Sequence, residues 1–218
     1  MKTISILKNT VQEYAWGSYT AIAELLGEKS PSDMPQAEFW MGAHPKAPSM
    51  VKCVGKWVSL LKLIENNPED ILGREAAQKF NNTLPYLFKV LAAAKPLSIQ
   101  AHPNKIQAVK GFEKENRLGI PIDASGRNYK DDNHKPECIC ALTHFWALNG
   151  FRRVSEILSL MERICPQYLA EELDKLRNQP DKQGLKIFFT ALLTMEPERK
   201  KHVIDDVLKN ARRFSEDD

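Results

Sequence analysis

A run of alternating polar and apolar side chains at 96–103 constrains the fold of this chain more than any other feature. The run reads Pro-Leu-Ser-Ile-Gln-Ala-His-Pro, so a proline bounds it at each end. Successive side chains on a β-strand point to opposite faces, which places Ser98, Gln100 and His102 on one face. The apolar side chains between them, such as Ile99, lie on the other face. The run therefore predicts a strand with one face for a core and one face for a metal ion.

A carboxylate follows in the segment Asn133-His-Lys-Pro-Glu137. If this segment pairs with the first, Glu137 joins Gln100 and His102 in a set of one imidazole nitrogen and two oxygen donors. Such a set suits zinc, whose bonds to these atoms measure about 2.0–2.2 Å. A neutral amide ligand would also leave the zinc acidic enough to polarise a substrate oxygen. The alternative is a polar barrel interior that holds no metal.

Lys89 stands in the middle of the apolar run 84–91. One interpretation is an exposed lysine on an edge strand, where lysines are common. The other is a lysine withdrawn from water, which is costly unless an anionic group meets it. A buried Lys89 would need a carboxylate of the protein or the phosphate of a ligand. Because few residues separate the runs 84–91 and 96–103, we expect them to be neighbours in a sheet.

The character of the sequence changes near residue 150. With 218 residues, of which 43% are hydrophobic, the chain can bury one good core or two modest ones. Before residue 150, short apolar runs are broken by Pro, Gly and Asn, which is typical of a sheet or barrel with long loops. After it, apolar residues recur at helical steps of three and four. We therefore predict a mixed α and β chain, with a β-rich domain over 1–150 and a small helical domain over 151–218.

Six helices are predicted from these apolar periodicities and from their flanking breaks. Two belong to the first domain and four to the second. The breaks in the second domain are Cys165-Pro-Gln167 and Gln179-Pro-Asp181. The predicted helices cover 21–26, 68–80, 154–164, 168–176, 185–195 and 203–211.

Charge and hydropathy exclude several classes of partner. The 31 basic and 28 acidic residues leave a net charge of +3, and the basic residues are spread along the chain. The largest basic cluster, 199–202, has acidic neighbours and is typical of a solvated helix surface rather than a nucleic-acid patch. No apolar stretch is long enough for a signal peptide or a membrane span. We expect no nucleic-acid or membrane partner and a cytoplasmic location, and the oligomeric state is left open.

The four cysteines are too few and too widely spaced for a disulfide scaffold or a zinc ribbon. We expect them to be reduced. If 137–142 is a strand, Cys138 and Cys140 point away from Glu137. Their expected role is core packing rather than metal binding, and the other two cysteines are Cys53 and Cys165.

Four motifs, in order and at compatible intervals, resemble those of type I mannose-6-phosphate isomerases. The likeness runs from about residue 5 to the end of the chain and is densest before residue 152. The motifs are Gln12-Glu-Tyr-Ala-Trp-Gly-Ser18, Ala37-Glu-Phe-Trp-Met-Gly-Ala-His-Pro-Lys46, the run 96–105 and Asn128-Tyr-Lys-Asp-Asp-Asn-His-Lys-Pro-Glu137.

This resemblance implies a fold and an activity. The family has a cupin-type (jelly-roll) catalytic barrel, a helical domain inserted into it and a further jelly-roll domain. Its members interconvert mannose 6-phosphate and fructose 6-phosphate with one zinc ion. The chain would then supply a cupin-type β-barrel portion followed by a small helical domain, and the reaction would transfer a proton through a cis-enediol.

The resemblance also implies roles for six residues. Gln100, His102 and Glu137 would bind one Zn²⁺ per chain. Lys89, Ser98 and Lys135 would line the sugar-phosphate pocket, with Lys135 as a candidate proton carrier or oxyanion partner. Trp16 and Glu38 lie in family motifs without an assigned chemical step, and His44 and His134 are expected to be turn, loop or packing residues.

The family likeness leaves a gap that bears on activity. Family members are longer, and their remaining barrel strands, a fourth zinc ligand and an essential arginine follow the helical domain. We therefore expect an N-terminal portion that binds zinc weakly and has no useful turnover alone. The second candidate function is a catalytically silent cupin-type protein that binds a metal or a sugar phosphate.

Overall fold

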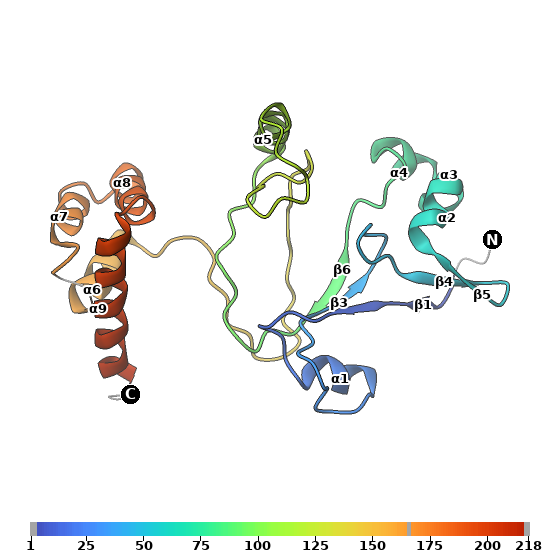
Figure 1. Ribbon diagram of the computed structural model, residues 1–218, viewed down its shortest axis with the longest axis horizontal. Coiled ribbons are helices and arrows are strands. Elements are labelled where there is room, and N and C mark those ends of the chain that lie inside the picture. The colour runs from blue at the N-terminus through green and yellow to red at the C-terminus, as the bar shows by residue number, and fades with distance from the viewer. Residues whose placement is uncertain (1–3, 165–166, 216–218) are drawn as a thin grey trace. The chain divides into compact units, whose positions relative to one another are not determined.

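The computed structural model describes residues 4–164 and 167–215. The chain divides into two compact units, Met1–Glu137 and Cys138–Asp218, and each is described by itself. Antiparallel sheets and helices form the first unit and helices form the second (Figure 1), so the prediction of a mixed α and β chain is confirmed. Among the described helices, none combines the length and the apolar character that a membrane crossing requires.

Two three-stranded antiparallel sheets form the centre of the first unit. The first has the order β1-β4-β5, and a tight turn at Val54 and Gly55, both with positive φ, joins its last two strands as in a type I′ hairpin. The second has the order β2-β3-β6 and carries Lys89. The strands are β1 Leu7–Lys8, β2 Thr10–Gln12, β3 Glu38–Met41, β4 Met50–Cys53, β5 Lys56–Ser59 and β6 Phe88–Leu91.

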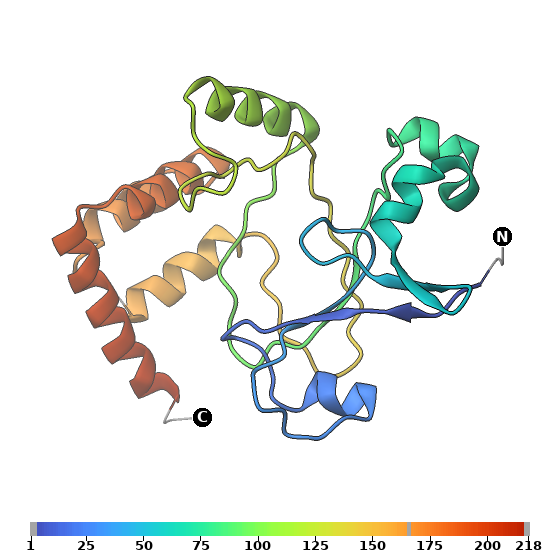
Figure 2. The ribbon, with the colours of Figure 1, turned by 45° about the vertical axis from the view of Figure 1, so that its right-hand side comes forward.

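Among the described residues of the first unit, five helices accompany these sheets (Figures 1 and 2). The predicted helix at 21–26 is confirmed as α1. The predicted helix at 68–80 is two helices, because Gly73 interrupts it with φ 81°. The sequence reasoning missed α2 and α5. The helices are α1 Ala21–Leu26, α2 Leu60–Asn66, α3 Pro68–Leu72, α4 Arg74–Lys79 and α5 Lys105–Arg117.

The start of α5 lies directly after the candidate metal-binding run. Asn104 caps the helix: its side chain accepts from the Gln107 N–H at 2.9 Å, and the Gln107 side chain accepts from the Asn104 N–H at 3.0 Å. This reciprocal pair satisfies backbone donors that a helix start leaves unpaired. The chain that follows His102 is therefore fixed to a rigid helix end.

The prediction of a strand at 96–103 is wrong. The described structure assigns no strand between 96 and 104, and Ile99, expected in a core, is 84% exposed. Alternation sets only the direction of side chains, whereas a strand also needs a neighbour that supplies backbone hydrogen bonds. No described strand pairs with this run.

The prediction of a strand at 137–142 is wrong for the same reason. The segment has no ladder partner in the described part of the chain. Cys138 and Cys140 are exposed, so their expected core-packing role is also wrong, while Cys53 is half-buried. Cys165 lies outside the described residues.

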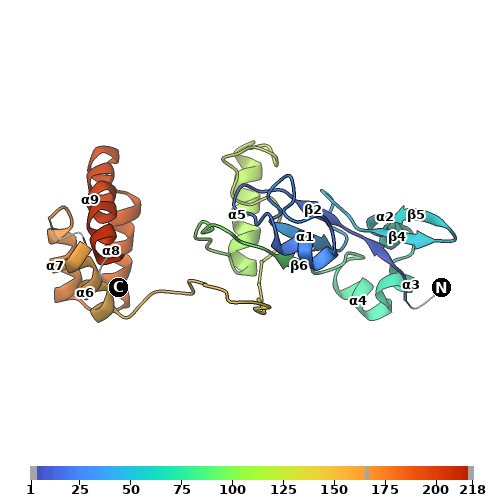
Figure 3. The same ribbon diagram turned by 90° about the horizontal axis from the view of Figure 1, so that it is seen from below.

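The described part of the second unit has four helices around one apolar cluster. The predicted helices of this region are confirmed (Figure 3), with bounds that differ by a few residues. The break at 179–181 is confirmed, since Asp181 caps the next helix by accepting from the Gly184 N–H at 2.8 Å. The break at 165–167 lies mostly outside the described residues. The helices are α6 Val154–Ile164, α7 Ala170–Asn178, α8 Lys182–Leu193 and α9 Pro197–Ser215.

The apolar periodicity of the second unit faces its core, as expected. Leu169, Leu173 and Leu176 are almost fully buried, together with Phe188 of α8. The apolar side chains of α6 pack against this cluster. Full burial of each such side chain contributes about 1.5–3 kcal/mol, which explains why helices of this length are stable together although each would be marginal alone.

Candidate metal centre

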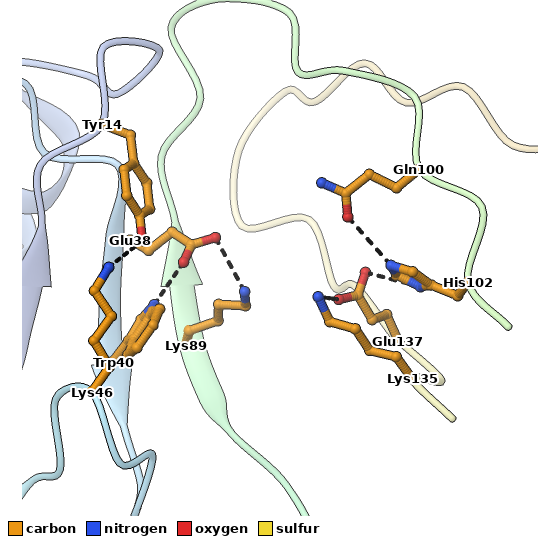
Figure 4. A network of polar contacts seen from close by, with 9 residues as sticks. All are labelled: Tyr14, Glu38, Trp40, Lys46, Lys89, Gln100, His102, Lys135 and Glu137. Carbon is orange, nitrogen blue, oxygen red and sulfur yellow. Dashed lines mark hydrogen bonds and ion pairs between the residues drawn. The ribbon is translucent and has the colours of Figure 1, made fainter. Parts of the chain in front are cut away.

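Three predicted metal ligands converge in the first unit although their segments form no sheet (Figure 4). The Gln100 Oε1 atom lies 3.3 Å from Nε2 of His102. The His102 Nδ1 atom lies 3.8 Å from Oε2 of Glu137. The amide and the imidazole come from one segment and the carboxylate from another, about thirty residues later in the chain.

The donor set fits a zinc ion. Two ligands about 2.1 Å from a tetrahedral ion are about 3.4 Å apart, which is close to the observed separation of Gln100 and His102. Glu137 faces Nδ1 of His102, the ring nitrogen that Gln100 does not contact. A histidine binds a single metal ion through one of its two ring nitrogens. In the observed rotamers the Gln100 amide lies beside Nε2 of His102 and the Glu137 carboxylate lies beside Nδ1, where it orients the ring.

Gln100 is essential to this candidate site. Within the described residues, no three His, Cys, Asp or Glu side chains come together in a way that could hold a metal. His102 and Glu137 therefore need the Gln100 amide oxygen as a third protein donor. The side chains of His102 and Glu137 are 28% and 51% exposed, so an ion can reach them from solvent.

Lys135 lies beside the same cluster. Its Nζ atom is 3.5 Å from Oε1 of Glu137, and both side chains are about half exposed. The sequence placed the two residues on one face, and the contact agrees with this although the segment is not a strand. Ser98 and His134 are exposed on the two segments that carry the cluster.

Lys89 has the anionic partner that its position in an apolar strand requires. Its Nζ atom donates to Oε1 of Glu38 at 3.1 Å, and Nε1 of Trp40 donates to Oε2 of the same carboxylate at 2.6 Å. The Glu38 side chain is only 10% exposed. A carboxylate withdrawn from water is costly unless donors satisfy it, and here both oxygens have one.

The role of Glu38 was missed by the sequence reasoning. The available signal was the alternation of Glu38, Trp40 and their neighbours on β3, which puts an acid and an indole on one face. Lys89 lies directly opposite Trp40 in the ladder, so Glu38 is its diagonal neighbour. Spacing within one segment could not reveal this pairing.

A second lysine adjoins this pair through aromatic rings. The Lys46 Nζ atom lies 5.5 Å from the ring centre of Tyr14 and 5.8 Å from that of Trp40. The Tyr14 hydroxyl accepts from it at 3.4 Å. Such cation–π contacts hold a flexible side chain over a defined surface.

His44 is a turn residue, as predicted, and its ring accepts a hydrogen bond within the turn. The Lys46 N–H donates to its Nδ1 at 3.1 Å, and the ring lies 4.7 Å from that of Trp40. Partial burial lowers the pKa of His44, and the positive charges of Lys46, Lys89 and Lys135 lower it further. The negative charge of Asp131 acts in the opposite direction and raises the pKa of His44.

Comparison with known proteins identifies the family. The profile of the phosphomannose isomerase type I catalytic domain matches residues 4–154. The mannose-6-phosphate isomerase of Escherichia coli strain K12 is 50% identical over 206 residues, which are 94% of this chain and 52% of that protein. The human mannose-6-phosphate isomerase is 39% identical over 173 residues, covering 72% of this chain and 37% of the human protein.

Solved structures agree with the sequence comparisons. The mannose 6-phosphate isomerase of Salmonella typhimurium bound to its substrate (f6p) and zinc matches with a TM-score of 0.86 at 47% identity. The match covers 96% of this chain and 52% of that one. A zinc-bound mannose 6-phosphate isomerase gives a TM-score of 0.85 at 48% identity, covering 95% of this chain and 52% of that chain.

The chain spans about half the length of the curated bacterial relatives that it matches. Over that half the sequence and the fold agree with one family. The chain therefore belongs to the type I phosphomannose isomerase family, and its matched region is that of the catalytic domain.

Proposed function

We propose that this protein is a zinc-dependent aldose–ketose isomerase that interconverts mannose 6-phosphate and fructose 6-phosphate. The observation that carries the proposal is the convergence of Gln100, His102 and Glu137, with separations of 3.3 and 3.8 Å between successive donors. The relatives that share this half of the chain include one solved with its substrate and zinc. Gln100, His102 and Glu137 are the proposed ligands of one Zn²⁺.

The chain's own residues account for substrate binding in this proposal. Lys89 offers a fixed positive charge to the sugar phosphate, and the Ser98 hydroxyl can donate a hydrogen bond beside it. Glu38 uses one donor of the Lys89 ammonium, which has three, so the Glu38 contact and a phosphate contact are compatible. Lys89 and Ser98 are therefore proposed substrate-binding residues.

Proton transfer is assigned to the region of Lys135. Removal of a proton from the carbon beside the sugar carbonyl gives a cis-enediol, and return of the proton to the neighbouring carbon completes the isomerisation. The Lys135 ammonium can hold a proton or stabilise a developing oxyanion, with Glu137 within 3.5 Å. A bound zinc ion would supply the positive charge that polarises a sugar oxygen.

The finer architecture belongs to the same proposal. The two small antiparallel sheets are proposed to be part of a cupin-type jelly-roll barrel within a domain over 1–150, and 151–218 to be a separate helical domain. A barrel interior would also explain why polar side chains such as Glu38 and Lys89 line one face of a sheet. We propose a cytoplasmic location.

A coupled assay of the protein as its gene encodes it tests the proposal. The expected result is zinc-dependent formation of fructose 6-phosphate from mannose 6-phosphate, lost in the His102→Ala variant. Lys110→Met, an exposed change on α5, is the control for handling and folding. Binding of zinc and of mannose 6-phosphate without turnover would contradict the isomerase and favour the silent binding protein.

A further inference from the structure

Helix α5 binds the loop 127–133 at both of its ends, and this loop leads directly to Lys135 and Glu137. At the start of the helix, the Lys105 Nζ atom donates to the Asp132 carbonyl oxygen at 2.9 Å, to Asp132 Oδ2 at 3.0 Å and to Asn133 Oδ1 at 3.2 Å. All three donors of one ammonium are therefore used on two consecutive residues of the loop.

The other end of α5 holds the loop through buried groups. The Glu115 carboxylate accepts from the Tyr129 N–H at 2.8 Å and from the Asn128 N–H at 3.2 Å. Arg127, which is 5% exposed, donates to Asn116 Oδ1 at 2.7 Å and to the Tyr129 carbonyl at 2.7 Å. The backbone N–H of Tyr129 is the main reason why the pKa of Glu115 is lowered.

The middle of the helix packs against the same loop. A Cβ atom added at Gly111 would lie 2.5 Å from the Tyr129 ring, so the ring rests directly on the helix backbone. The Arg127 guanidinium lies 5.0 Å from the ring centre of Phe112. These contacts fix residues 127–129 to α5 several times over, without any help from Lys105.

Residues 132 and 133 are held differently, because the described hydrogen bonds from α5 to them all come from Lys105. The same end of the helix fixes the other half of the metal centre, since the Asn104 capping box follows His102 directly. No described β-ladder joins 96–104 to 132–137. Lys105 thus connects the segment of Gln100 and His102 to the segment of Glu137.

We propose that Lys105 is a positioning residue that sets the distance between His102 and Glu137 in the metal centre. The inference rests on the zinc site proposed above. Without the Lys105 ammonium, the loop stays attached at 127–129 but its end is free to move, so Glu137 loses its place beside the His102 ring. Metal affinity then falls because ordering the ligands costs conformational entropy on binding.

A simple surface ion pair would not have this effect. Exposed lysine–carboxylate pairs contribute about 0–1 kcal/mol to stability. The side chains of Lys105 and Asp132 are about half exposed, so the loss of their ion pair alone should leave the fold intact. Substitution of Lys105 should therefore change the free energy of unfolding little and the zinc affinity more.

The test measures zinc affinity, by competition with a chromophoric chelator, in the protein as its gene encodes it. Variants are Lys105→Met, which keeps the length of the side chain without its charge, and Lys105→Arg, which keeps donors. Lys110→Met is the matched control on the same helix. Co²⁺ absorption in the visible range reports the coordination geometry, and denaturant unfolding reports stability.

We expect Lys105→Met to weaken zinc binding about tenfold, the range seen when the partners that orient metal ligands are removed. Its Co²⁺ spectrum should change, its unfolding midpoint should match that of Lys110→Met, and Lys105→Arg should restore most of the affinity. Equal zinc affinity in Lys105→Met and Lys110→Met overturns the positioning role but leaves the zinc site. An unvaried protein that binds no zinc removes the site and the inference together.

Discussion

Lys89 reaches diagonally across the ladder between β3 and β6 to place its Nζ atom 3.1 Å from Oε1 of Glu38. Trp40, not Glu38, is its direct partner in the register. The indole N–H of Trp40 takes the second carboxylate oxygen, so one buried acid fixes both an indole and an ammonium. A flexible lysine is thereby given one position on the sheet before any ligand arrives (Figure 4).

This pairing predicts that stability and substrate binding respond differently to substitution. Lys89→Met should raise the KM for mannose 6-phosphate, because the phosphate loses its cation, with little change in zinc affinity. It should also lower the free energy of unfolding by about 1–3 kcal/mol, since the Glu38 charge loses a partner in a largely buried site. Steady-state kinetics and urea unfolding measure the two effects.

The double variant Lys89→Met with Glu38→Gln separates the effect on stability from the effect on substrate binding. The second change removes the uncompensated charge, so it should return most of the stability but none of the substrate affinity. If the double variant recovers a normal KM, Lys89 does not bind the phosphate. Asp33→Asn, which breaks the exposed ion pair with Lys29, is the surface control.

The two faces of the run 96–103 differ in what they contribute. His102→Ala should abolish zinc binding, because it removes the only imidazole of the proposed ligand set. Ile99→Ala should retain zinc and change the free energy of unfolding by less than about 0.5 kcal/mol, since Ile99 is 84% exposed. Metal analysis after dialysis against a zinc buffer checks both variants, and equal zinc retention would contradict the ligand assignment.

The lowered pKa of His44 predicts a pH effect on stability. Its pKa lies below the ordinary value of 6.5 in the folded protein, first because of partial burial and then because of nearby lysines. Below about pH 6.5 the unfolded chain binds this proton more readily, so stability falls as pH decreases toward the folded pKa. The His44→Gln variant should show less loss of unfolding free energy between about pH 7 and about pH 5.

NMR titration of the His44 ring measures the pKa directly. A midpoint at or above the ordinary value would contradict the lowered pKa of His44 and the pH effect that depends on it. Lys46→Met should raise the midpoint, because it removes the positive charge that lowers the pKa of His44 most.

In the helical unit, a buried acid links α7 to α9. Arg199 donates to both oxygens of Glu172 at 2.8 and 2.7 Å, and also to the Tyr168 carbonyl at 2.6 Å. These hydrogen bonds from Arg199 are the main reason why the pKa of Glu172 is lowered. The Arg199 side chain is 42% exposed, so solvent screens part of the interaction.

Arg199→Met should therefore lower the free energy of unfolding by about 1–2 kcal/mol at neutral pH, less than for a fully buried pair. The contribution is present above the ordinary glutamate pKa and is lost as pH falls through the lower folded value, so the cost should shrink in acid. Unfolding monitored by circular dichroism at neutral pH and in acid checks this prediction. Lys201→Met, exposed on the same helix, should have little effect at either.

Much of the helical unit could be predicted from sequence because its information is local. The apolar steps that begin at Val154 and the breaking sequence at 179–181 specify helices whose ends and faces depend on nearby residues. The helix at 68–80 was wrong in one detail, since a glycine with positive φ at Gly73 divides it.

The identities of the candidate metal ligands were also readable from sequence, through their residue types and the family motifs. Their convergence was inferred from two strands that the structure does not contain. Strand pairing depends on a neighbour far along the chain, which alternation within 96–103 cannot supply. The residues were therefore brought together by reasoning from strands, whereas in the structure they meet on segments that form no sheet.

Sequence alone indicated the family, determined the helical periodicities and named the candidate metal ligands. Only the tertiary structure decided which groups contact the candidate site residues and the segments that carry them: Glu38 contacts Lys89, and Lys105 contacts the loop before Glu137. The physical reason is that a hydrogen bond across a ladder, or from a helix to a loop, joins residues that are far apart in the chain. Such a pair leaves no local pattern in the sequence. Local patterns record the direction of a side chain, whereas its partner is set by the path of the whole chain.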